Sequence, residues 1–408
     1  MAPGRATMTI MKLPRRSFVA GMAAPVLADV TTSKVNPSYP RSVGDRIDPW
    51  LELYPKAFQH NLQFIRRRTG RPVIAVVKCN GYGLDHRVVG PILDPLPEVA
   101  ALAVVTEEEA ITLRDSGVRK PILLMDDFIE SAAGELAARN ITFAAFTADA
   151  GKRLTALAGR AGHPLNVQIY LDTGFHRMGM DWRQAEPWIV ALAEDPAIRI
   201  TGTFTELCED FSFDKEQIAR FGALTTKLTG RGVKLGPLHA IASKGIAKHP
   251  EAVFDMVRPG NMIYGIMPDD TEPAEFDIQV TYTLKARIIR IVRLEAGESA
   301  GYGRAFLTSK PTEVAVVKCG RTDGYIYRTG GKGTHVLIRS KLYPVVGRVS
   351  ASHCLADLGL GHGAGVRDVV TLLGPEPGVR PYEIADTLGI GRYESFSLSA
   401  RLPRYIVT

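Results

Sequence analysis

The chain has 408 residues, of which 45% are hydrophobic, so it can bury one large core or two moderate ones. Its formal charge of +7 falls to +3 without the four basic residues that precede Ala28, a segment that holds no acidic residue. A balance so near neutrality does not indicate a nucleic-acid-binding protein.

The cysteines and histidines do not form a metal-binding pattern. The four cysteines are widely spaced and include no Cys-x-x-Cys pair, and no His-x-x-x-His pair occurs. We therefore predict no metal site and expect buried free thiols at Cys79, Cys208, Cys319 and Cys354.

The first residues have the layout of an export signal. Arg15 and Arg16 are followed by the apolar run 20–28, which is too short to span a bilayer. We predict a twin-arginine signal over residues 1–28, a linker over residues 29–45 and a periplasmic mature protein. The alternative is a disordered basic leader, with translation starting at a later methionine. No later segment approaches membrane-spanning length, so we expect no membrane span.

From residue 46 to residue 270, short β-rich runs alternate with amphipathic helical stretches such as 107–116 and 214–228. Eight strand candidates with helical spacers predict an α/β fold, a (β/α)₈ barrel of the TIM type. The predicted strands are 73–77, 101–105, 121–125, 141–146, 166–171, 200–205, 235–241 and 254–263.

After residue 270 the helical rhythm fades, and residues 271–408 are predicted to form a second, mostly β domain. The glycine-rich run 359–365 precedes a strand-like run rather than a helix, so we interpret it as a flexible turn and not as a dinucleotide loop. The predicted strands are 280–293, 313–319, 335–339, 342–349 and 366–373.

Lys78 ends the apolar strand in the stretch Ala-Val-Val-Lys-Cys-Asn-Gly-Tyr-Gly, residues 75–83. At the C-terminal rim of a parallel barrel this lysine would be half desolvated, which lowers an amine's pKa and frees it to form a Schiff base. The alternative is an ordinary surface lysine at a strand end.

The stretch 75–83 resembles the pyridoxal-phosphate lysine segment of the alanine racemase family (pyridoxal-phosphate fold type III). Four further segments resemble that family in the expected order, and the resemblance covers residues 46–408. These segments are Leu-Asp-Thr-Gly-Phe-His-Arg-Met-Gly at 171–179, Phe-Asp-Met-Val-Arg-Pro-Gly at 254–260, Gly-Tyr-Gly-Arg at 301–304 and Leu-Ser-Ala-Arg-Leu-Pro-Arg at 398–404.

The resemblance implies an amino-acid racemase with pyridoxal 5'-phosphate as its cofactor. Lys78 matches the base on one face of the substrate, and Tyr302 matches the base that the partner subunit supplies on the other face. It therefore implies a head-to-tail homodimer with two shared sites. Taken by itself, Tyr302 could also be an aromatic packed against a loop.

Other matched positions imply binding roles. Arg258 resembles the arginine that faces the pyridine nitrogen of the cofactor, although a salt bridge to Asp255 is the alternative. Arg177 resembles the arginine that meets the substrate carboxylate, although it could pair with Asp172. The cofactor phosphate is expected to contact Tyr82, Ser243 and the backbone at Gly260 and Asn261.

Several positions depart from the family pattern. Glu206 stands where a histidine usually stacks on the pyridine ring, unless its carboxylate turns to Arg258, and Tyr170 replaces a lysine that is carbamylated in many members. Ala400 lacks a phosphate-binding tyrosine found in some members.

The substrate entrance departs as well, because Arg321 replaces a tyrosine and Ala351 and Ser352 replace a Met-Asp pair. These changes give more room and an extra cation. We expect a pocket for amino acids larger than alanine, with room for a second polar or anionic group.

Two other functions stay open at this point. One is epimerisation or decarboxylation of an unusual amino acid on the same scaffold, although decarboxylation needs no opposed second base. The other is an exported protein that binds pyridoxal phosphate or an amino acid without catalysis. The sequence does not identify the physiological substrate, the signal cleavage site or the role of Glu206.

Overall fold

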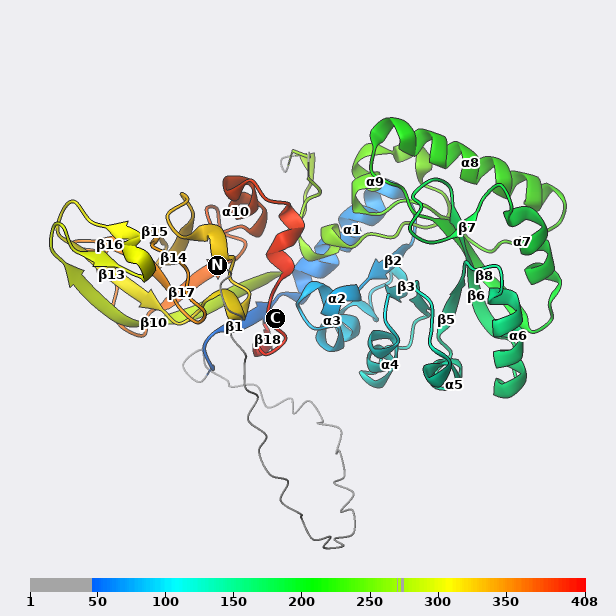
Figure 1. The fold of residues 1–408 in the computed structure, drawn as a ribbon, viewed down its shortest axis with the longest axis horizontal. Helices are drawn as coiled ribbons and strands as arrows, with labels where there is room; N and C mark the ends of the chain where they lie inside the picture. Colours follow the sequence, from blue (N-terminus) through cyan, green and yellow to red (C-terminus); the bar gives the residue numbers. More distant parts are fainter. Residues whose placement is uncertain (1–45, 270, 273–274) are drawn as a thin grey trace, which may run out of the picture. The chain divides into compact units, whose positions relative to one another are not determined.

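The computed structural model describes residues 46–269, 271–272 and 275–408 (Figure 1). The predicted signal and linker over residues 1–45 lie outside them. None of the helices in the described part combines the length and the apolar character needed to cross a membrane.

The first half of this part contains a parallel sheet whose strands follow one another in chain order, apart from the two-residue β7 (Met180–Asp181), which pairs with β6. Each strand is followed by helical structure, as the alternating pattern predicts. The strands on the main path are β2 (Val73–Val76), β3 (Val99–Val104), β4 (Ile122–Leu124), β5 (Thr142–Ala145), β6 (Leu165–Asp172), β8 (Ile198–Thr205) and β9 (Leu238–His239).

The barrel closes through a short eighth segment. Met256 forms a parallel bridge with His239, and Val257 forms one with Val73. The predicted strand 254–263 was therefore too long, because Pro259 has no N–H to donate and the chain turns into the 3₁₀ helix η3 (Asn261–Tyr264).

The barrel interior is filled unequally from its two sides. Strands β2 to β5 contribute Ile74, Val76, Leu123 and small alanines, whereas β6 and β8 contribute Tyr170 and Phe204. The two aromatic rings stack with centroids 4.3 Å apart. Large side chains on one side thus face small ones on the other. A cavity adjoins the end of β2, where Val76, Tyr170 and Phe204 all line it.

The helices surround these strands in Figure 1. Their buried residues belong to a core that lies between helices and sheet and is separate from the barrel interior. The helices are α1 (Pro55–Thr69), α2 (Lys78–Tyr82), α3 (His86–Leu93), α4 (Glu107–Asp115), α5 (Glu130–Ala138), α6 (Ala150–Ala161), α7 (Ala185–Glu194), α8 (Phe211–Gly230), α9 (Ser243–Lys248) and the 3₁₀ helix η2 (Pro250–Ala252).

The C-terminal region forms a second, mainly antiparallel sheet, in which β13 also pairs with β10 and so curls the sheet on itself. Three of its strands were not predicted, β1 (Trp50–Leu53), β16 and β18, nor were the hairpin strands β11 and β12 and the helix α10 (Pro381–Leu388). The strands are β10 (Tyr282–Leu294), β13 (Thr312–Val317), β14 (His335–Ile338), β15 (Lys341–Val346), β16 (Cys354–Gly359), β17 (Val369–Leu373) and β18 (Arg404–Ile406), with a small hairpin of β11 (Ser299–Ala300) and β12 (Phe306–Leu307).

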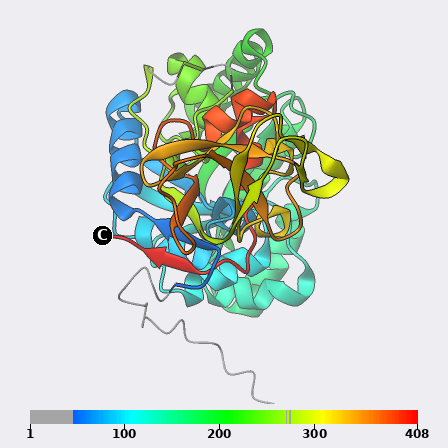
Figure 2. The ribbon, with the colours of Figure 1, turned by 90° about the vertical axis from the view of Figure 1, so that its left-hand side faces the viewer.

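The first strand of the chain belongs to this second sheet. β1 (Trp50–Leu53) pairs antiparallel with β10 and parallel with β18, and Figure 2 shows the blue β1 beside the red β18. The predicted barrel range of 46–270 therefore begins too early, because residues 50–53 belong to the second sheet. A local pattern cannot reveal this, because the partners of β1 lie more than 200 residues away.

The four cysteines are free. Cys319 and Cys354 are buried as expected, but Cys79 is exposed and Cys208 is partly buried. Both follow the carboxyl ends of barrel strands, Cys79 in the short helix α2 and Cys208 in the segment after β8.

Candidate active site

A cavity of about 480 Å³ opens at the carboxyl ends of the barrel strands. Such a volume suits a small-molecule ligand. Seven residues that the sequence analysis assigned to the site line it: Lys78, Tyr82, Arg177, Ser243, Arg258, Gly260 and Asn261.

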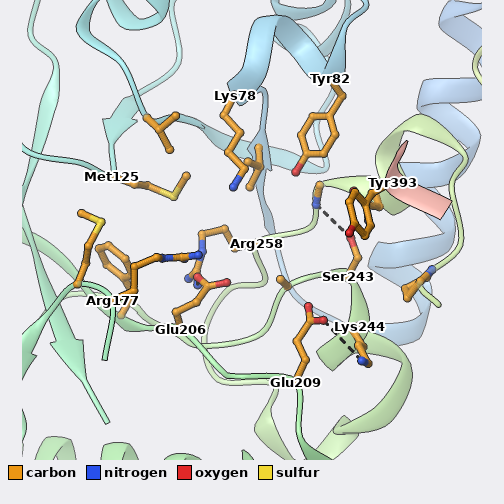
Figure 3. Close-up of a pocket in the computed structure, with 18 of the residues that line it drawn as sticks. Lys78, Tyr82, Met125, Arg177, Glu206, Glu209, Ser243, Lys244, Arg258 and Tyr393 are labelled. Carbon is orange, nitrogen blue, oxygen red and sulfur yellow. Dashed lines mark hydrogen bonds and ion pairs between the residues drawn. The ribbon is translucent and has the colours of Figure 1, made fainter. Parts of the chain in front are cut away.

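Lys78 and Tyr82 reach the cavity from one unusual turn. Cys79, Asn80, Gly81 and Tyr82 all have φ between 52° and 60°, so α2 contains a left-handed turn. The backbone N–H of Asn80 donates to Oε1 of Glu109 at 3.0 Å, which ties this turn to α4. Both side chains then point into the same space (Figure 3).

Tyr82 lies against a glycine that has no room for a side chain. A Cβ atom on Gly260 would lie 2.0 Å from the Tyr82 hydroxyl. The Tyr82 ring packs on Tyr264 with centroids 4.6 Å apart, and burial raises the pKa of Tyr82, so the phenol stays protonated. A neutral phenol is a hydrogen-bond donor, which suits an anionic ligand.

Ser243 holds the neighbouring backbone. Its Oγ accepts the N–H groups of Gly260 at 3.1 Å and of Met262 at 3.2 Å. The backbone N–H of Gly260 therefore donates to Ser243. This differs from the prediction, in which that N–H donates to the cofactor phosphate. Because both acceptor positions of the hydroxyl are in use, its own hydrogen is available to donate to a ligand.

Arg258 is a buried cation at the base of the cavity, with an exposed fraction of 2%. It donates to Nδ1 of His239 at 2.7 Å and to the backbone oxygen of Thr205 at 2.9 Å. Its Nη2 also lies 2.7 Å from a carboxylate oxygen of Glu206. The expected alternative partner, Asp255, instead accepts the N–H of Leu238.

His239 is neutral in this arrangement. Burial lowers its pKa strongly, and the adjacent Arg258 lowers it further. Its Nε2 lies 2.9 Å from Oε1 of Gln168, so Nδ1 can accept from Arg258.

Arg177 lies at the exposed edge of the cavity. It packs over the ring of Phe175 at 4.3 Å, while Asp172, its expected alternative partner, pairs with His176 at 3.0 Å. Burial raises the pKa of the Tyr170 phenol, as does Glu206, whereas Arg258 and Arg177 act in the opposite direction. Tyr170, which stands where many members of the family have a carbamylated lysine, is thus a neighbour of Arg177.

The other predicted residues do not line this cavity. Tyr302, with an exposed fraction of 71%, lines a separate apolar cavity of about 390 Å³ beside Ser350 and His353. The backbone N–H of Arg321 donates to the oxygen of Ser350 at 3.0 Å. The structure thus places Tyr302, Arg321, Ala351 and Ser352 in the second sheet domain and keeps them out of the barrel cavity.

Several residues of the cavity were missed, among them five titratable ones: Asp126, Glu209, Lys244, Asp269 and Tyr393. Lys244 and Glu209 form an ion pair at 3.6 Å, Asp126 lies two residues after β4, Asp269 accepts the N–H of Arg392, and Tyr393 reaches the cavity from the 3₁₀ helix η8 (Arg392–Phe396). Figure 3 labels Tyr393 and Ser243 among the side chains that line this cavity. No motif marks Tyr393, but its neighbour Arg392 carries it there by bonding to residues at the end of the barrel.

Fold and site define a barrel enzyme with a lysine, hydroxyl donors for an anion and a buried arginine in one cavity. The family models "Alanine racemase, N-terminal domain" and "Alanine racemase, C-terminal domain" match residues 54–268 and 281–406. The chain belongs to the alanine racemase family. Enzymes of this family are isomerases that use pyridoxal 5'-phosphate, so the protein is a pyridoxal-phosphate-dependent amino-acid racemase.

Individual relatives cover nearly the whole described chain. An alanine racemase of Desulforamulus reducens is 32% identical over 88% of this chain and 98% of its own length. One of Pasteurella multocida is 34% identical over 83% and 92%. The solved structure of the biosynthetic alanine racemase from Pseudomonas aeruginosa matches with a TM-score of 0.76 at 29% identity, over 88% of this chain and 99% of that one.

The residues present fit the cofactor. The contact between Gly260 and Tyr82, together with the bonds to Ser243, forms a cradle in which two hydroxyls can donate to a phosphate. Lys78 lines the same cavity and supplies the amine that a pyridoxal carbonyl requires.

We expect Gly260→Ala to weaken cofactor binding about tenfold or more, because the new methyl group displaces the Tyr82 hydroxyl and a hydrogen bond to a charged group is worth about 1.5–3 kcal/mol. Titration of the cofactor-free protein with pyridoxal phosphate measures this. Gly222→Ala, in α8 with nothing within 4 Å of the added atom, is the matched control and leaves the affinity unchanged. Equal affinities in the two variants would exclude the proposed cradle.

Proposed function

We propose that the protein interconverts L- and D-amino acids with two opposed bases, Lys78 on one face and Tyr302 of the partner subunit on the other. The observation that carries the proposal is the single cavity shared by Lys78, Tyr82, Ser243 and Arg258 at the carboxyl ends of the barrel strands. Pyridoxal phosphate, when bound, supplies an electron sink that makes the α-proton of the substrate removable.

Each cavity residue then has a defined task. Tyr82 and Ser243 would donate to the phosphate, and Arg258 would face the ring nitrogen. The Lys78 amine would hold the carbonyl carbon of the cofactor in the resting enzyme. Once the substrate's amine has taken its place there, the released Nζ would take or return a proton on its own face. Arg177, at the exposed edge, orients the substrate carboxylate.

The second base is proposed to come from another copy of the chain. Tyr302 is exposed and lies outside the barrel cavity of its own chain. A head-to-tail homodimer would bring Tyr302 of the partner subunit over Lys78. Arg321, Ala351 and Ser352 belong to the same domain and would arrive with it as part of the substrate entrance.

The substrate range is proposed to extend beyond alanine. Ala351 and Ser352 are small and exposed, and Arg321 is bonded to the backbone of the same loop. Together they leave room for a longer side chain and offer it a cation.

We expect α-proton exchange in D₂O, followed by NMR, with alanine and with at least one of serine, lysine, arginine and glutamate at comparable rates. Formation of the D-enantiomer checks that exchange is racemisation. Lys78→Ala abolishes exchange, because no group then serves its face. Exchange confined to alanine would refute the broad range. A cofactor-loaded dimer with no exchange would favour an epimerase, a decarboxylase or a binding protein instead.

Mixed dimers test the shared site. A Lys78→Ala subunit and a Tyr302→Phe subunit, co-expressed with different affinity tags and purified as a pair, contain one site with both changes and one intact site. We expect about half the wild-type activity per dimer, although each homodimeric variant is inactive or nearly so. Pairing Lys78→Ala with the double variant removes both lysines and is the matched inactive control. An inactive mixed dimer would place both bases in one chain.

The protein is proposed to act in the periplasm after twin-arginine export. The support is the pair Arg15 and Arg16 before an apolar run that ends near Ala28. This route carries folded proteins, which suits an enzyme that acquires its cofactor in the cytoplasm.

Replacing Arg15 and Arg16 together by lysine keeps the charge, and we expect it to retain the protein in the cytoplasm. Cell fractionation measures the distribution, and mass spectrometry of the exported form locates the cleavage site. Lys12→Arg is the control that leaves the arginine pair intact. Equal periplasmic amounts of the double variant and the wild type would argue against this route.

A further inference from the structure

Glu206 places a carboxylate beside the buried cation of the cavity. Its Oε2 lies 2.7 Å from Nη2 of Arg258, and its side chain is 26% exposed. Both residues line the cavity. Figure 3 shows the two side chains next to each other below Lys78. A charge-assisted bond this short holds the guanidinium in one orientation.

Glu206 is the anionic partner of Arg258 within the described residues. The other two acceptors of Arg258 are neutral: the backbone oxygen of Thr205 and the buried imidazole of His239. These three hydrogen bonds occupy three of the five N–H groups of a guanidinium. One N–H group on Nη1 and the Nε–H take no part in these three bonds.

The loop that carries Glu206 is fixed from behind. Nε2 of Gln217, in α8, donates to the backbone oxygen of Glu206 at 3.0 Å, and its Oε1 accepts the N–H of Cys208 at 2.9 Å. The buried Gln217 thus forms hydrogen bonds with the backbone on both sides of Leu207. Gln217 therefore fixes the backbone at Glu206, and the bond to Arg258 fixes the carboxylate.

We propose that Glu206 is a positioning residue that neutralises Arg258 and so sets how far the ring nitrogen of the bound cofactor is protonated. This inference rests on the proposed function, in which Arg258 faces that nitrogen. A lone guanidinium opposes a positive charge on the ring. The Arg258–Glu206 pair carries no net charge and opposes it far less.

Other charged and titratable groups line the same cavity and would also influence the pKa of the ring nitrogen. Lys78, Arg177 and Lys244 are cations, whereas Asp126, Glu209 and Asp269 are anions. Tyr170 and Tyr82 both have raised pKa values, for which burial is the largest cause and Glu206 a further one, and so remain neutral. The Glu209 carboxylate pairs with Lys244 rather than with Arg258, which makes it a matched comparison for Glu206.

The test uses full-length protein loaded with pyridoxal phosphate labelled with ¹⁵N in its ring, observed by solid-state NMR over a pH series. In Glu206→Gln the ring resonance moves toward its unprotonated position, and the nitrogen's pKa falls by about one unit or more. Glu206→Ala moves it in the same direction and serves if the glutamine variant does not fold. Glu206→Asp keeps the charge and stays near the wild type.

Glu209→Gln, the matched control, leaves the resonance in place. Equal resonances in the wild type and in the neutral Glu206 variants would overturn the inference, as would an equal shift in Glu209→Gln. If the protein racemises amino acids and the resonance does not move, only this inference fails. If the protein binds no pyridoxal phosphate, the proposed function fails and the inference falls with it.

Discussion

The left-handed turn over residues 79–82 is the constraint on which the site depends. Residues with side chains lose roughly 1–2 kcal/mol each in this conformation, so the turn persists only because its surroundings hold it. Glu109 accepts the N–H of Asn80, and the buried Arg404 donates to the oxygen of Gly83 at 2.8 Å. The turn reverses the chain within four residues, which is why Lys78 and Tyr82 reach one cavity from a single segment.

The end of the chain is therefore part of the support of the barrel site. Arg404 lies in β18, which pairs with β1, and β1 leads directly into the barrel. Arg392 bonds to the backbone oxygens of Pro268 and Thr271 and so places its neighbour Tyr393 in the lining of the cavity. Because Arg404 bonds directly to Gly83 and β18 pairs with β1, loss of the C-terminal residues would remove a contact that holds the lysine turn as well as a strand of the second sheet.

The sequence revealed what is encoded locally. The buried apolar runs of the barrel and motif residues such as Lys78 and Arg258 were found because neighbours in the chain mark them. Strand β18, the assignment of β1 to the second sheet and the place of Tyr393 were missed, since they depend on pairing between distant segments. The engaged N–H of Gly260 was also missed, because the seryl oxygen that accepts it lies 17 residues away. Local pattern thus located the chemistry, and only tertiary contacts showed how it is supported.

The departures from the family pattern inside the barrel form one physically consistent group. Removing a guanidinium such as that of Arg258 from water costs several kcal/mol unless its partners replace the lost solvation. His239 is neutral and stacks on Phe204, Phe204 stacks on Tyr170, and the Arg258 guanidinium lies 5.1 Å from the Phe204 ring centroid. The stacked rings of Tyr170, Phe204 and His239 stabilise Arg258 by dispersion, but none of them carries a full negative charge. Glu206 supplies that charge, and it does so from the cavity side, where the same carboxylate can also act on a bound ligand.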